Sequence, residues 1–315
     1  MAGVSIIGSG NVGANAAFFI AEKGVTDVLM VDIATGLSRG KALDVMEAAP
    51  IRRYRNTISG SDSLEDIRGS PVIVVAAGAI RAPGMRREEL YGANAGLIRD
   101  LAPRIARLAP DATVLMATEP VDGLTTLFVR ASGMPRTRVL GLGGVLDSTR
   151  LRALIALELQ VSSEIVSAMV IGRHSDDMVC LPRYCSVSGV PLPLLLPQPR
   201  IASLVEQTRS AGDLVVELAK RSTAYYAPSA AIAEIADSIH MDLKRVFSLS
   251  ILLQGEYGCQ DAALSLPVVI GEKGAARVLT PELLVDEVAV LRKSAKLIAD
   301  VVGQEPRRAS EGGVG

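Results

Sequence analysis

The sequence predicts an α/β protein built on a doubly wound parallel sheet, and three observations support this fold class. The chain opens with an apolar strand, 4–7, that runs directly into glycines at positions 8, 10 and 13. Short apolar runs then alternate with segments of helical composition as far as Leu142. One of these runs, 70–78, is continuous, which is typical of a parallel strand covered on both faces. Such alternation predicts parallel strands joined by helical crossovers.

The glycine-rich turn after the first strand favours binding of a dinucleotide. Gly8 can adopt backbone angles that are closed to other residues, Gly10 lets the chain approach a pyrophosphate, and Gly13 lets the next helix pack close to the strand. That helix, 14–23, ends at Gly24, and its N-terminus would point at the phosphates. A GxGxxG pattern alone is a weak signal, but the strand before it and the helix after it make the signal specific.

An acidic residue, Asp32, closes the second apolar strand, 28–32. It stands at the distance from the glycine-rich turn at which a carboxylate accepts hydrogen bonds from the ribose hydroxyls of adenosine. The same carboxylate would repel the 2′-phosphate of NADP. The sequence therefore predicts NAD as the cofactor, bound by a Rossmann domain.

Length and composition predict two domains and a tail. A chain of 315 residues can form two modest cores, and the dinucleotide unit needs only about half of that length. We expect an NAD-binding Rossmann domain at 1–145 and an α+β catalytic and substrate-binding domain at 146–302. The segment 303–315 is rich in Gly, Arg, Glu and Ser, and we expect it to be disordered.

Charge and cysteine content exclude several classes of function. The formal net charge is −1, which gives no electrostatic reason to expect nucleic acid or a membrane as partner. Three cysteines are too few, and odd in number, for a disulfide framework, so we expect a reducing cytoplasm. The N-terminus enters a strand without the segments of a cleavable signal, and no apolar run approaches the length of a membrane span. No metal site is indicated.

The segment Ile80–Leu90 follows the third long strand and differs from its neighbours. It is basic, contains Pro83 and Gly84, and connects a strand end to a helix, so it is well placed to act as a lid. Ligands of such a sheet bind at the carboxyl ends of the strands, where the winding reverses. The other elements expected in this half are helices at 36–49, 90–108 and 122–133 and strands at 57–61, 112–118 and 138–142.

The second half of the chain has a mixed pattern. Its first helix would be capped by Asp147 or Ser148. Pro191–Pro199 contains four prolines and is expected to be an irregular connection. The last helix would begin at Thr280-Pro-Glu282, which offers a cap, an N1 proline and an N-terminal acid, and its apolar face would hold Leu284, Val288, Leu291, Ala295 and Ile298. The other expected elements are helices at 147–160, 200–220 and 228–239 and strands at 165–172, 178–187, 246–253 and 262–270.

The two histidines of the chain receive different interpretations. A lone histidine is more often structural than catalytic, and His240, in a polar segment after a helix, keeps that interpretation. His174 instead follows an apolar strand whose end opens into a loop, and side chains at such ends reach a cleft. If Asp147 meets His174 in space, its carboxylate would orient the imidazole and stabilise the protonated form.

Several stretches match one known family in order and spacing. They are Gly8-Ser-Gly-Asn-Val-Gly13, Ala77-Gly-Ala-Ile-Arg-Ala-Pro-Gly-Met-Arg-Arg-Glu-Glu-Leu90, Gly144-Val-Leu-Asp-Ser-Thr-Arg150, His174-Ser-Asp176, Leu181-Pro-Arg-Tyr-Cys-Ser-Val-Ser-Gly189, Ala224-Tyr-Tyr-Ala-Pro228 and Leu266-Pro-Val-Val-Ile-Gly271. On these stretches the chain, up to about Val302, resembles the lactate/malate dehydrogenase family, and most closely its lactate-dehydrogenase-like malate dehydrogenases.

The resemblance implies a role for each matching residue. His174 falls on the family's proton donor and acceptor, and Asp147 falls on the carboxylate partnered with it. Arg150 falls on the arginine that holds the C1 carboxylate of the substrate as a planar fork. Arg87 falls on the lid arginine that polarises the carbonyl. Arg81 falls on the specificity position, where lactate enzymes carry glutamine and malate enzymes arginine.

The chemistry of Arg81 agrees with a dicarboxylate substrate. A second guanidinium matches a second carboxylate, whereas the methyl group of pyruvate would leave it unpaired in a closed site.

The residues expected to contact NAD are Gly8, Gly10, Asn11, Val12, Gly13, Asp32, Ala77, Gly78, Asn94 and Thr118.

Three departures from the family gather at the expected substrate site. Glu119 stands where the family has asparagine, and Arg173 and Ser175 replace glycines on either side of His174. An ionised Glu119 about 4 Å from a substrate carboxylate would cost on the order of 4 kcal/mol at an effective dielectric of about 20. Glu119 could be protonated by desolvation or paired with Arg173; otherwise the chain is a poor malate dehydrogenase or acts on another acid. We expect the compensated pair, with weakened malate activity.

The resemblance therefore implies an NAD-dependent oxidoreductase that interconverts malate and oxaloacetate by hydride transfer. The expected partners are a small dicarboxylate substrate and, as in other family members, further copies of the chain in a homodimer or homotetramer. Two alternatives remain. A non-catalytic NAD-binding paralogue is favoured by the altered Glu119, Arg173 and Ser175. A dehydrogenase of another 2-hydroxy acid, such as lactate, is disfavoured by Arg81.

Overall fold

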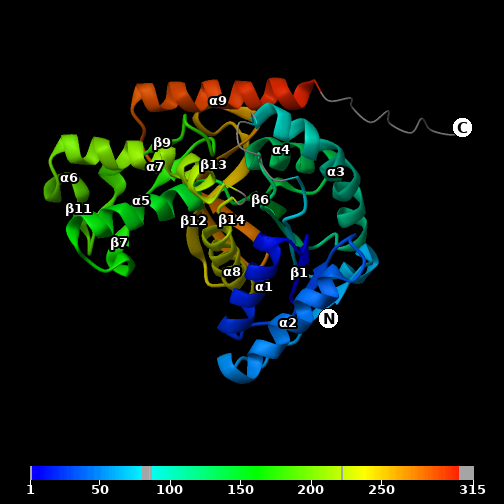
Figure 1. Ribbon diagram of the computed structural model, residues 1–315. Helices are drawn as coiled ribbons and strands as arrows, with labels where there is room; N and C mark the ends of the chain where they lie inside the picture. Colours follow the sequence, from blue (N-terminus) through cyan, green and yellow to red (C-terminus); the bar gives the residue numbers. More distant parts are fainter. Residues whose placement is uncertain (1, 80–84, 86, 221–222, 305–315) are drawn as a thin grey trace, which may run out of the picture.

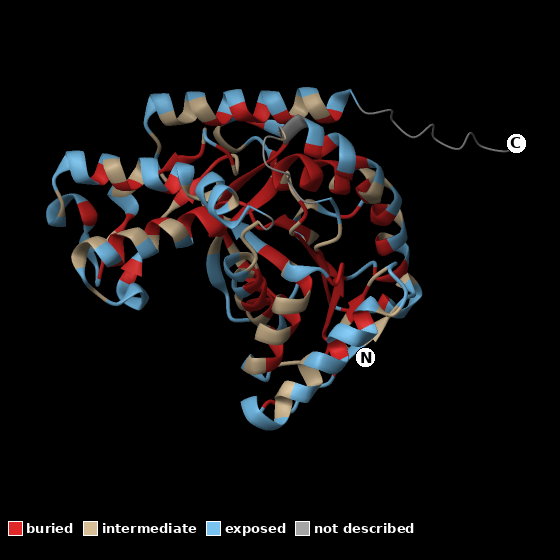
Figure 2. Cartoon of the chain, in the orientation of Figure 1, coloured by how far each residue is buried: buried red, intermediate tan, exposed pale blue. Residues whose placement is uncertain are grey.

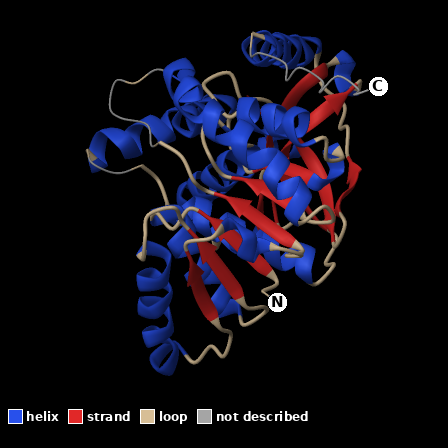
Figure 3. Ribbon diagram, turned by 90° about the vertical axis from the view of Figure 1, so that its right-hand side faces the viewer, coloured by secondary structure: helices blue, strands red, loops and turns tan. Residues whose placement is uncertain are grey.

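A computed structural model of the protein describes residues 2–79, 85, 87–220 and 223–304. The chain forms an α/β fold in which helices lie on both sides of a central sheet, as Figure 1 and Figure 3 show. Within the described residues, the largest sheet has the strand order β14-β13-β12-β6-β5-β4-β1-β2-β3. The tail that the sequence predicts to be disordered lies, from residue 305 onward, outside these residues.

Six parallel strands form the N-terminal part of this sheet. Their side chains are almost all buried, because helices cover both faces and leave no solvent-facing side. The chain runs outward from β1 to β2 and β3 and then returns to β4 on the other side of β1, so the winding reverses between β1 and β4. The strands are β1 (Val4–Ile7), β2 (Val28–Val31), β3 (Ile58–Ser61), β4 (Val72–Val75), β5 (Thr113–Met116) and β6 (Val139–Gly141).

Helices connect most of these strands. Figure 2 shows their buried residues turned toward the sheet and their exposed residues turned outward. The doubly wound Rossmann arrangement predicted from the sequence is confirmed. The helices are α1 (Asn11–Lys23), α2 (Leu37–Arg52), α3 (Arg87–Leu108) and α4 (Val121–Ser132). α1 and α3 bury one face each, whereas the first eight residues of α4 are all buried and α2 buries only Ser38 and Ala42.

Three antiparallel strands from the second half of the chain extend the same sheet beyond β6. The junction is the pairing of Ser250 on β12 with Gly141 on β6. The third of these strands was not predicted, because its sequence, Gly274–Val278, has little β-branched or aromatic character. The strands are β12 (Arg245–Gln254), β13 (Gln260–Gly271) and β14 (Gly274–Val278). The domain boundary at residue 145 stays a prediction.

Of the remaining elements, α8 packs beside α1 in the middle of Figure 1, α9 runs across its top, and most of the others build the part of the molecule on the left. Short strands there form two small sheets, in the orders β11-β10-β7 and β8-β9. The helices are α5 (Gly144–Leu159), α6 (Leu192–Leu195), α7 (Gln198–Ala219), α8 (Tyr226–His240) and α9 (Val285–Gly303). The strands are β7 (Val166–Ser167), β8 (Val170–Ile171), β9 (Val179–Cys180), β10 (Ser186–Val187) and β11 (Val190–Pro191).

Several element boundaries in this half were predicted wrongly. The expected strands 165–172 and 178–187 are each broken in two, and the second is interrupted by a 3₁₀ turn at Pro182–Tyr184. The expected connection 191–199 contains the single turn of α6 and the start of α7. Neither break is visible in the sequence, because buried apolar runs look alike whether or not they bend.

The starts of α5 and α9 also differ from expectation. α5 begins at Gly144, so Asp147 lies in its first turn and does not cap it. α9 begins at Val285 rather than at Thr280, and the Glu287 carboxylate accepts a hydrogen bond of 2.8 Å from the Leu284 backbone N–H. Leu284 is consequently exposed, whereas Leu291, Ala295 and Ile298 are buried as predicted. Among the described helices, none has the length and apolar character needed to cross a membrane.

We expect replacement of Gly13 by alanine to destabilise the fold by about 1–3 kcal/mol, because the added Cβ would overlap the carbonyl oxygen of Gly8 in a packed βα turn. Gly96 on α3 is a matched control, since a Cβ there meets no atom within 4 Å. Gly96→Ala should stabilise the protein by about 0.5–1 kcal/mol through helix propensity. Urea denaturation of both variants measures the two effects, and equal stabilities would contradict the packing argument.

Candidate active site

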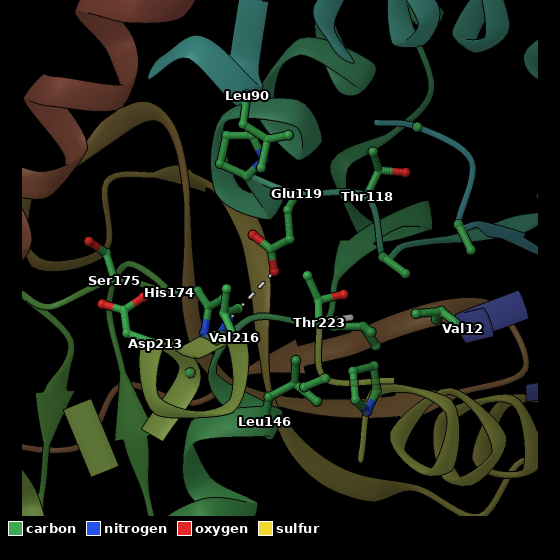
Figure 4. A pocket seen from close by; sticks show the side chains of 18 of the residues that line it. Val12, Leu90, Thr118, Glu119, Leu146, His174, Ser175, Asp213, Val216 and Thr223 are labelled. Carbon is green, nitrogen blue, oxygen red and sulfur yellow. Dashed lines mark ion pairs between the residues drawn. The ribbon is translucent and has the colours of Figure 1, made fainter. Parts of the chain in front are cut away.

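A cavity of about 180 Å³ opens at the carboxyl ends of the parallel strands. Figure 4 shows Val12 on one side of it, Glu119 and His174 in the middle, and Asp213 and Ser175 on the other side. Its walls come from segments that are far apart in the sequence: the first βα turn, the ends of β4 and β5, α5, the loop that carries His174, α7 and the start of α8. This is the position at which a doubly wound sheet binds its ligands.

The turn after β1 has the shape that a pyrophosphate requires. Gly8 has φ +102°, and a Cβ there would overlap the backbone of Ala76 and Ala77 at the end of β4. Gly10 caps α1, and a Cβ at this position would meet no atom within 4 Å, so the helix N-terminus borders open space. The first turn of α1 carries no acidic residue, which leaves its positive end available to an anion.

Asp32 is fixed at the end of β2 beside this turn. One carboxylate oxygen accepts a hydrogen bond of 2.7 Å from the Ser9 N–H, and the other accepts one of 2.9 Å from the Ala34 N–H. The carboxylate is therefore held in one orientation before any ligand arrives. A fixed anion at this point suits a ribose diol and opposes a 2′-phosphate.

Asn94 and Thr118, both predicted to contact the cofactor, join the ends of β4 and β5. The Asn94 side chain accepts a hydrogen bond of 2.7 Å from the Ala79 N–H and donates one of 2.7 Å to the Glu119 carbonyl oxygen. The Thr118 hydroxyl donates a hydrogen bond of 2.7 Å to the Ala77 carbonyl oxygen. Thr118 lines the cavity, while Asn94 is buried behind its wall and positions the backbone on either side.

Backbone hydrogen bonds hold the loop that carries His174 in place. Gly172, at the end of β8, exchanges two backbone hydrogen bonds with Ser265 on β13, of 2.8 and 2.9 Å. The His174 N–H then donates a hydrogen bond of 2.7 Å to the buried Asp122 carboxylate at the start of α4. Ser250 on β12 donates a hydrogen bond of 2.6 Å to the other oxygen of Asp122. The loop is thus pinned to the central sheet on both sides.

The Asp147 carboxylate holds His174 and Arg150 together. One oxygen lies 2.6 Å from His174 Nδ1, and the other lies 3.0 Å from Arg150 Nη1. Asp147 is 1% exposed, so the ion pairs form out of water. The approach of α5 depends on Gly144, where a Cβ would collide with β12 and β8, and the Gly144 N–H donates a hydrogen bond of 2.8 Å to the Ser265 hydroxyl. The predicted contact between Asp147 and His174 is present.

Glu119 lies on the opposite side of the imidazole. Its Oε1 is 3.5 Å from His174 Nε2, and its Oε2 accepts a hydrogen bond of 3.1 Å from the Val121 N–H. The expected pair between Glu119 and Arg173 is wrong. Arg173 instead forms an ion pair of 2.8 Å with Asp177, because its side chain points away from the cavity toward α9.

Among the three altered positions, Arg173 and Ser175 serve the loop rather than the cavity centre. The Asp177 carboxylate that binds Arg173 also accepts a hydrogen bond of 2.6 Å from Ser294 on α9. Ser175 is buried, and its N–H donates a hydrogen bond of 2.8 Å to the Arg173 carbonyl oxygen. The Arg173 side chain therefore ties the His174 loop to α9 by way of Asp177, whereas the Ser175 contact is made by the backbone and does not depend on the side chain.

Two family models match the chain with these features in place. The lactate/malate dehydrogenase NAD-binding domain matches residues 2–141, and the lactate/malate dehydrogenase α/β C-terminal domain matches residues 144–303. The chain belongs to the lactate/malate dehydrogenase family. Its N-terminal part is consequently an NAD-binding domain, and the open helix N-terminus and fixed Asp32 fit that cofactor.

Relatives of this family resemble the chain over nearly its whole length. Malate dehydrogenase from Desulforudis audaxviator is 41% identical over 95% of this chain and 97% of its own. The structure of malate dehydrogenase from Picrophilus torridus in its apo form has a TM-score of 0.90 at 37% identity, covering 95% and 97% of the two chains. Lactate dehydrogenase from Cryptosporidium parvum, complexed with lactic acid and β-nicotinamide adenine dinucleotide, has a TM-score of 0.91 at 34% identity, covering 96% and 98%.

Two arginines with expected roles in substrate binding cannot be placed. Arg81 lies outside the described residues, and Arg87 begins α3 but its side chain is not described. Arg150 lines the cavity, as do Glu119 and His174. His240 is exposed at the last turn of α8 and does not line it. The assignments of roles stay predictions.

The sequence did not indicate four residues of the site that the structure brings forward. Arg209, Asp213 and Thr223 line the cavity from α7 and the segment after it, and Asp122 supports His174 from behind. The signal for the first two was weak, since a long polar helix with Gly212 in its middle resembles a solvated surface helix. Asp122 was interpreted as the start of a helix, and nothing in its neighbourhood indicated that it would be only 4% exposed.

The charges around His174 stabilise its protonated form. Burial opposes the charge, but Asp147 and Glu119 outweigh it and raise the pKa of His174 from 6.5 to about 9, while Arg150 acts in the opposite direction. Burial also raises the pKa of Asp122 from 3.8 to about 6, against the hydrogen bonds from Ser250 and His174. His174 is therefore an imidazolium at neutral pH in the structure.

The raised pKa of His174 predicts a loss of stability at alkaline pH. The stabilisation is fully present below pH 6.5 and is lost as the pH rises through about 9, because the folded state binds the proton more tightly. We expect the free energy of unfolding to fall by about 3 kcal/mol over this window. The raised pKa of Asp122 also lowers stability as the pH rises, but only between pH 3.8 and about 6, so its effect does not overlap with that of His174.

Denaturation of the wild type, His174→Gln and His240→Gln between pH 6.5 and 9.5 tests this dependence. The decline should vanish in His174→Gln and persist in His240→Gln, which removes the other histidine of the chain. A decline of the same size in His174→Gln would assign it to other groups.

Proposed function

We propose that the protein is an NAD-dependent malate dehydrogenase, which interconverts malate and oxaloacetate. The observation that carries this proposal is the contact of the Asp147 carboxylate with both His174 Nδ1 and Arg150 Nη1, at the mouth of an NAD-binding sheet. NAD supplies the hydride acceptor or donor of the reaction at its nicotinamide ring. The chain supplies a proton, a carboxylate-binding group and a cavity of about 180 Å³.

His174 carries out the proton transfer in this proposal. Asp147 occupies Nδ1, so Nε2 is the nitrogen left to face the cavity. Protonated Nε2 gives its proton to the C2 oxygen when oxaloacetate is reduced, and neutral Nε2 takes the proton from the C2 hydroxyl when malate is oxidised. Asp147 fixes the ring and stabilises the imidazolium.

Arg150 is the candidate for binding the C1 carboxylate. One edge of its guanidinium is engaged by Asp147, and the side chain is 20% exposed toward the cavity. Its planar set of donors can still form a two-bond contact with a carboxylate. Arg209 on α7 adds a second guanidinium to the same cavity wall. We assign preference for the second carboxylate to Arg81.

We further propose that the protein works in the cytoplasm as a homodimer or homotetramer. Cys180, Cys185 and Cys259 are free and buried, which suits a reducing compartment. Large apolar side chains are exposed on neighbouring helices, among them Leu157 at 75% and Leu218 at 72%. Burial of these side chains between copies of the chain would favour association. Analytical ultracentrifugation gives the oligomeric state directly.

We expect His174→Ala to abolish oxidation of NADH with oxaloacetate, because it removes the imidazole that Asp147 orients and that donates the proton in this proposal. The expected loss in kcat is at least about a hundredfold, the usual contribution of a general acid. Absorbance at 340 nm follows the reaction, and His240→Ala is the matched control. Wild-type protein that binds NADH but oxidises none with any 2-oxo acid would favour the non-catalytic alternative.

We expect Arg81→Gln to shift substrate preference from oxaloacetate toward pyruvate. The guanidinium pairs with a second carboxylate, and its loss removes about 1–3 kcal/mol or more of discrimination. The ratio of kcat/KM for the two substrates measures the shift, with Arg53→Gln on the exposed surface as control. A ratio that does not change would remove Arg81 from the specificity role.

A further inference from the structure

The imidazole of His174 lies between two carboxylates. Asp147 contacts Nδ1 at 2.6 Å, and Glu119 Oε1 lies 3.5 Å from Nε2. Figure 4 marks the second contact with a dashed line across the middle of the cavity. Nε2 is the nitrogen that must exchange a proton with the substrate, so Glu119 stands beside a reacting atom. The C2 oxygen of a substrate has to approach the same nitrogen.

Several contacts hold Glu119 in this place. The backbone carbonyl oxygen of Glu119 accepts a hydrogen bond of 2.7 Å from buried Asn94, which fixes the end of β5. Its Oε2 accepts a hydrogen bond of 3.1 Å from the N–H of Val121, the first residue of α4. The N-terminus of a helix favours a negative charge. The side chain is 38% exposed, so the carboxylate also reaches solvent.

Other charged groups surround His174, but among the described residues none is shown in contact with Nε2 except Glu119. α5 contributes Asp147 and Arg150, and the start of α4 contributes Asp122, which contacts the backbone N–H of His174 rather than the ring. α7 contributes Arg209 and Asp213 to the same cavity wall. Arg173 and Asp177, in the loop of His174 itself, are paired with each other. The described residues of α9 that face His174 across the neighbouring cavity are Leu297, Ile298 and Val301.

We propose that Glu119 is a catalytic residue that binds the proton-bearing Nε2 of His174, so that Glu119, His174 and Asp147 act as one carboxylate–imidazole–carboxylate unit. The kinetic part of this inference rests on the proposed dehydrogenase function. The electrostatic part does not, because it concerns the free protein.

The unit sets the protonation state of His174 from which each direction of the reaction starts near neutral pH. In reduction, the N–H bond at Nε2 breaks, the proton goes to the C2 oxygen, and the neutral ring takes a new proton from solvent by way of the Glu119 carboxylate. In oxidation, the O–H bond at C2 breaks and Nε2 must accept the proton, which it can do only when the ring is neutral. Glu119 therefore keeps the proton donor for 2-oxo acid reduction charged at neutral pH and moves the pH at which the ring can accept a proton from a 2-hydroxy acid to higher values.

The chain contains only two histidines, which allows a direct test. Protein labelled with ¹³C at histidine Cε1 is titrated by NMR without cofactor or substrate, and His174→Gln assigns the two signals. In the wild type, the His174 signal should titrate well above pH 6.5. In Glu119→Gln, which keeps the size and removes the charge, the His174 midpoint should fall by about one pH unit or more.

Controls separate the direct contact from a general effect of charge. Glu65→Gln removes one carboxylate from an exposed ion pair with Arg68 and should leave the His174 midpoint unchanged. Glu119→Asn, which restores the residue expected in the family, gives a second neutral side chain if Glu119→Gln unfolds. An unchanged His174 midpoint in a folded neutral variant overturns the proposal.

The pH dependence of kcat/KM gives the second measurement. For malate oxidation, the inflection should move to lower pH in Glu119→Gln, and the rate at pH 7 should rise by about tenfold for each pH unit that the inflection moves. Relief of repulsion between Glu119 and substrate would raise the whole profile without moving its inflection, and that result overturns the catalytic role. A lower NMR midpoint in a protein without dehydrogenase activity would retain the electrostatic unit and refute the proposed function.

Discussion

The site depends on one buried carboxylate that holds two partners at once. Asp147 touches the imidazole of His174 with one oxygen and the guanidinium of Arg150 with the other. A charge with 1% exposure persists only because both partners are cationic or can become so. The separation of the imidazole and the guanidinium is therefore set by a single side chain, and a shift of α5 would displace both together.

The fold could be predicted from the sequence wherever local rules suffice. The strand, the glycine turn and Asp32 lie within one short segment, so spacing alone specified their arrangement. The start of α5 could not be predicted, because Gly143 and Gly144 serve a close approach to strands more than a hundred residues later. The strand pieces between residues 165 and 187 escaped prediction for a related reason: their bends are imposed by tertiary packing.

The chemistry of the site was only partly accessible to sequence reasoning. The contact of His174 with Asp147 followed from the resemblance to a family and is present at 2.6 Å. The expected pairing of Glu119 with Arg173 was wrong. Arg173 and His174 are neighbours in the loop but point to opposite sides, and charge complementarity alone does not predict which of them faces Glu119. Asp122 was missed because its role is to hold a backbone N–H, and backbone contacts leave little trace in a sequence.

The continuity of the sheet between β6 and β12 limits how the molecule can open. Strand pairing at Gly141 and Ser250 joins the parallel strands of the first half of the chain and the antiparallel strands of the second half in one sheet. Rotation of one half against the other would rupture that pairing and detach Asp122 from Ser250. Opening the cavity by such a rotation would therefore cost hydrogen bonds in the sheet, whereas a local rearrangement at the rim of the cavity would not.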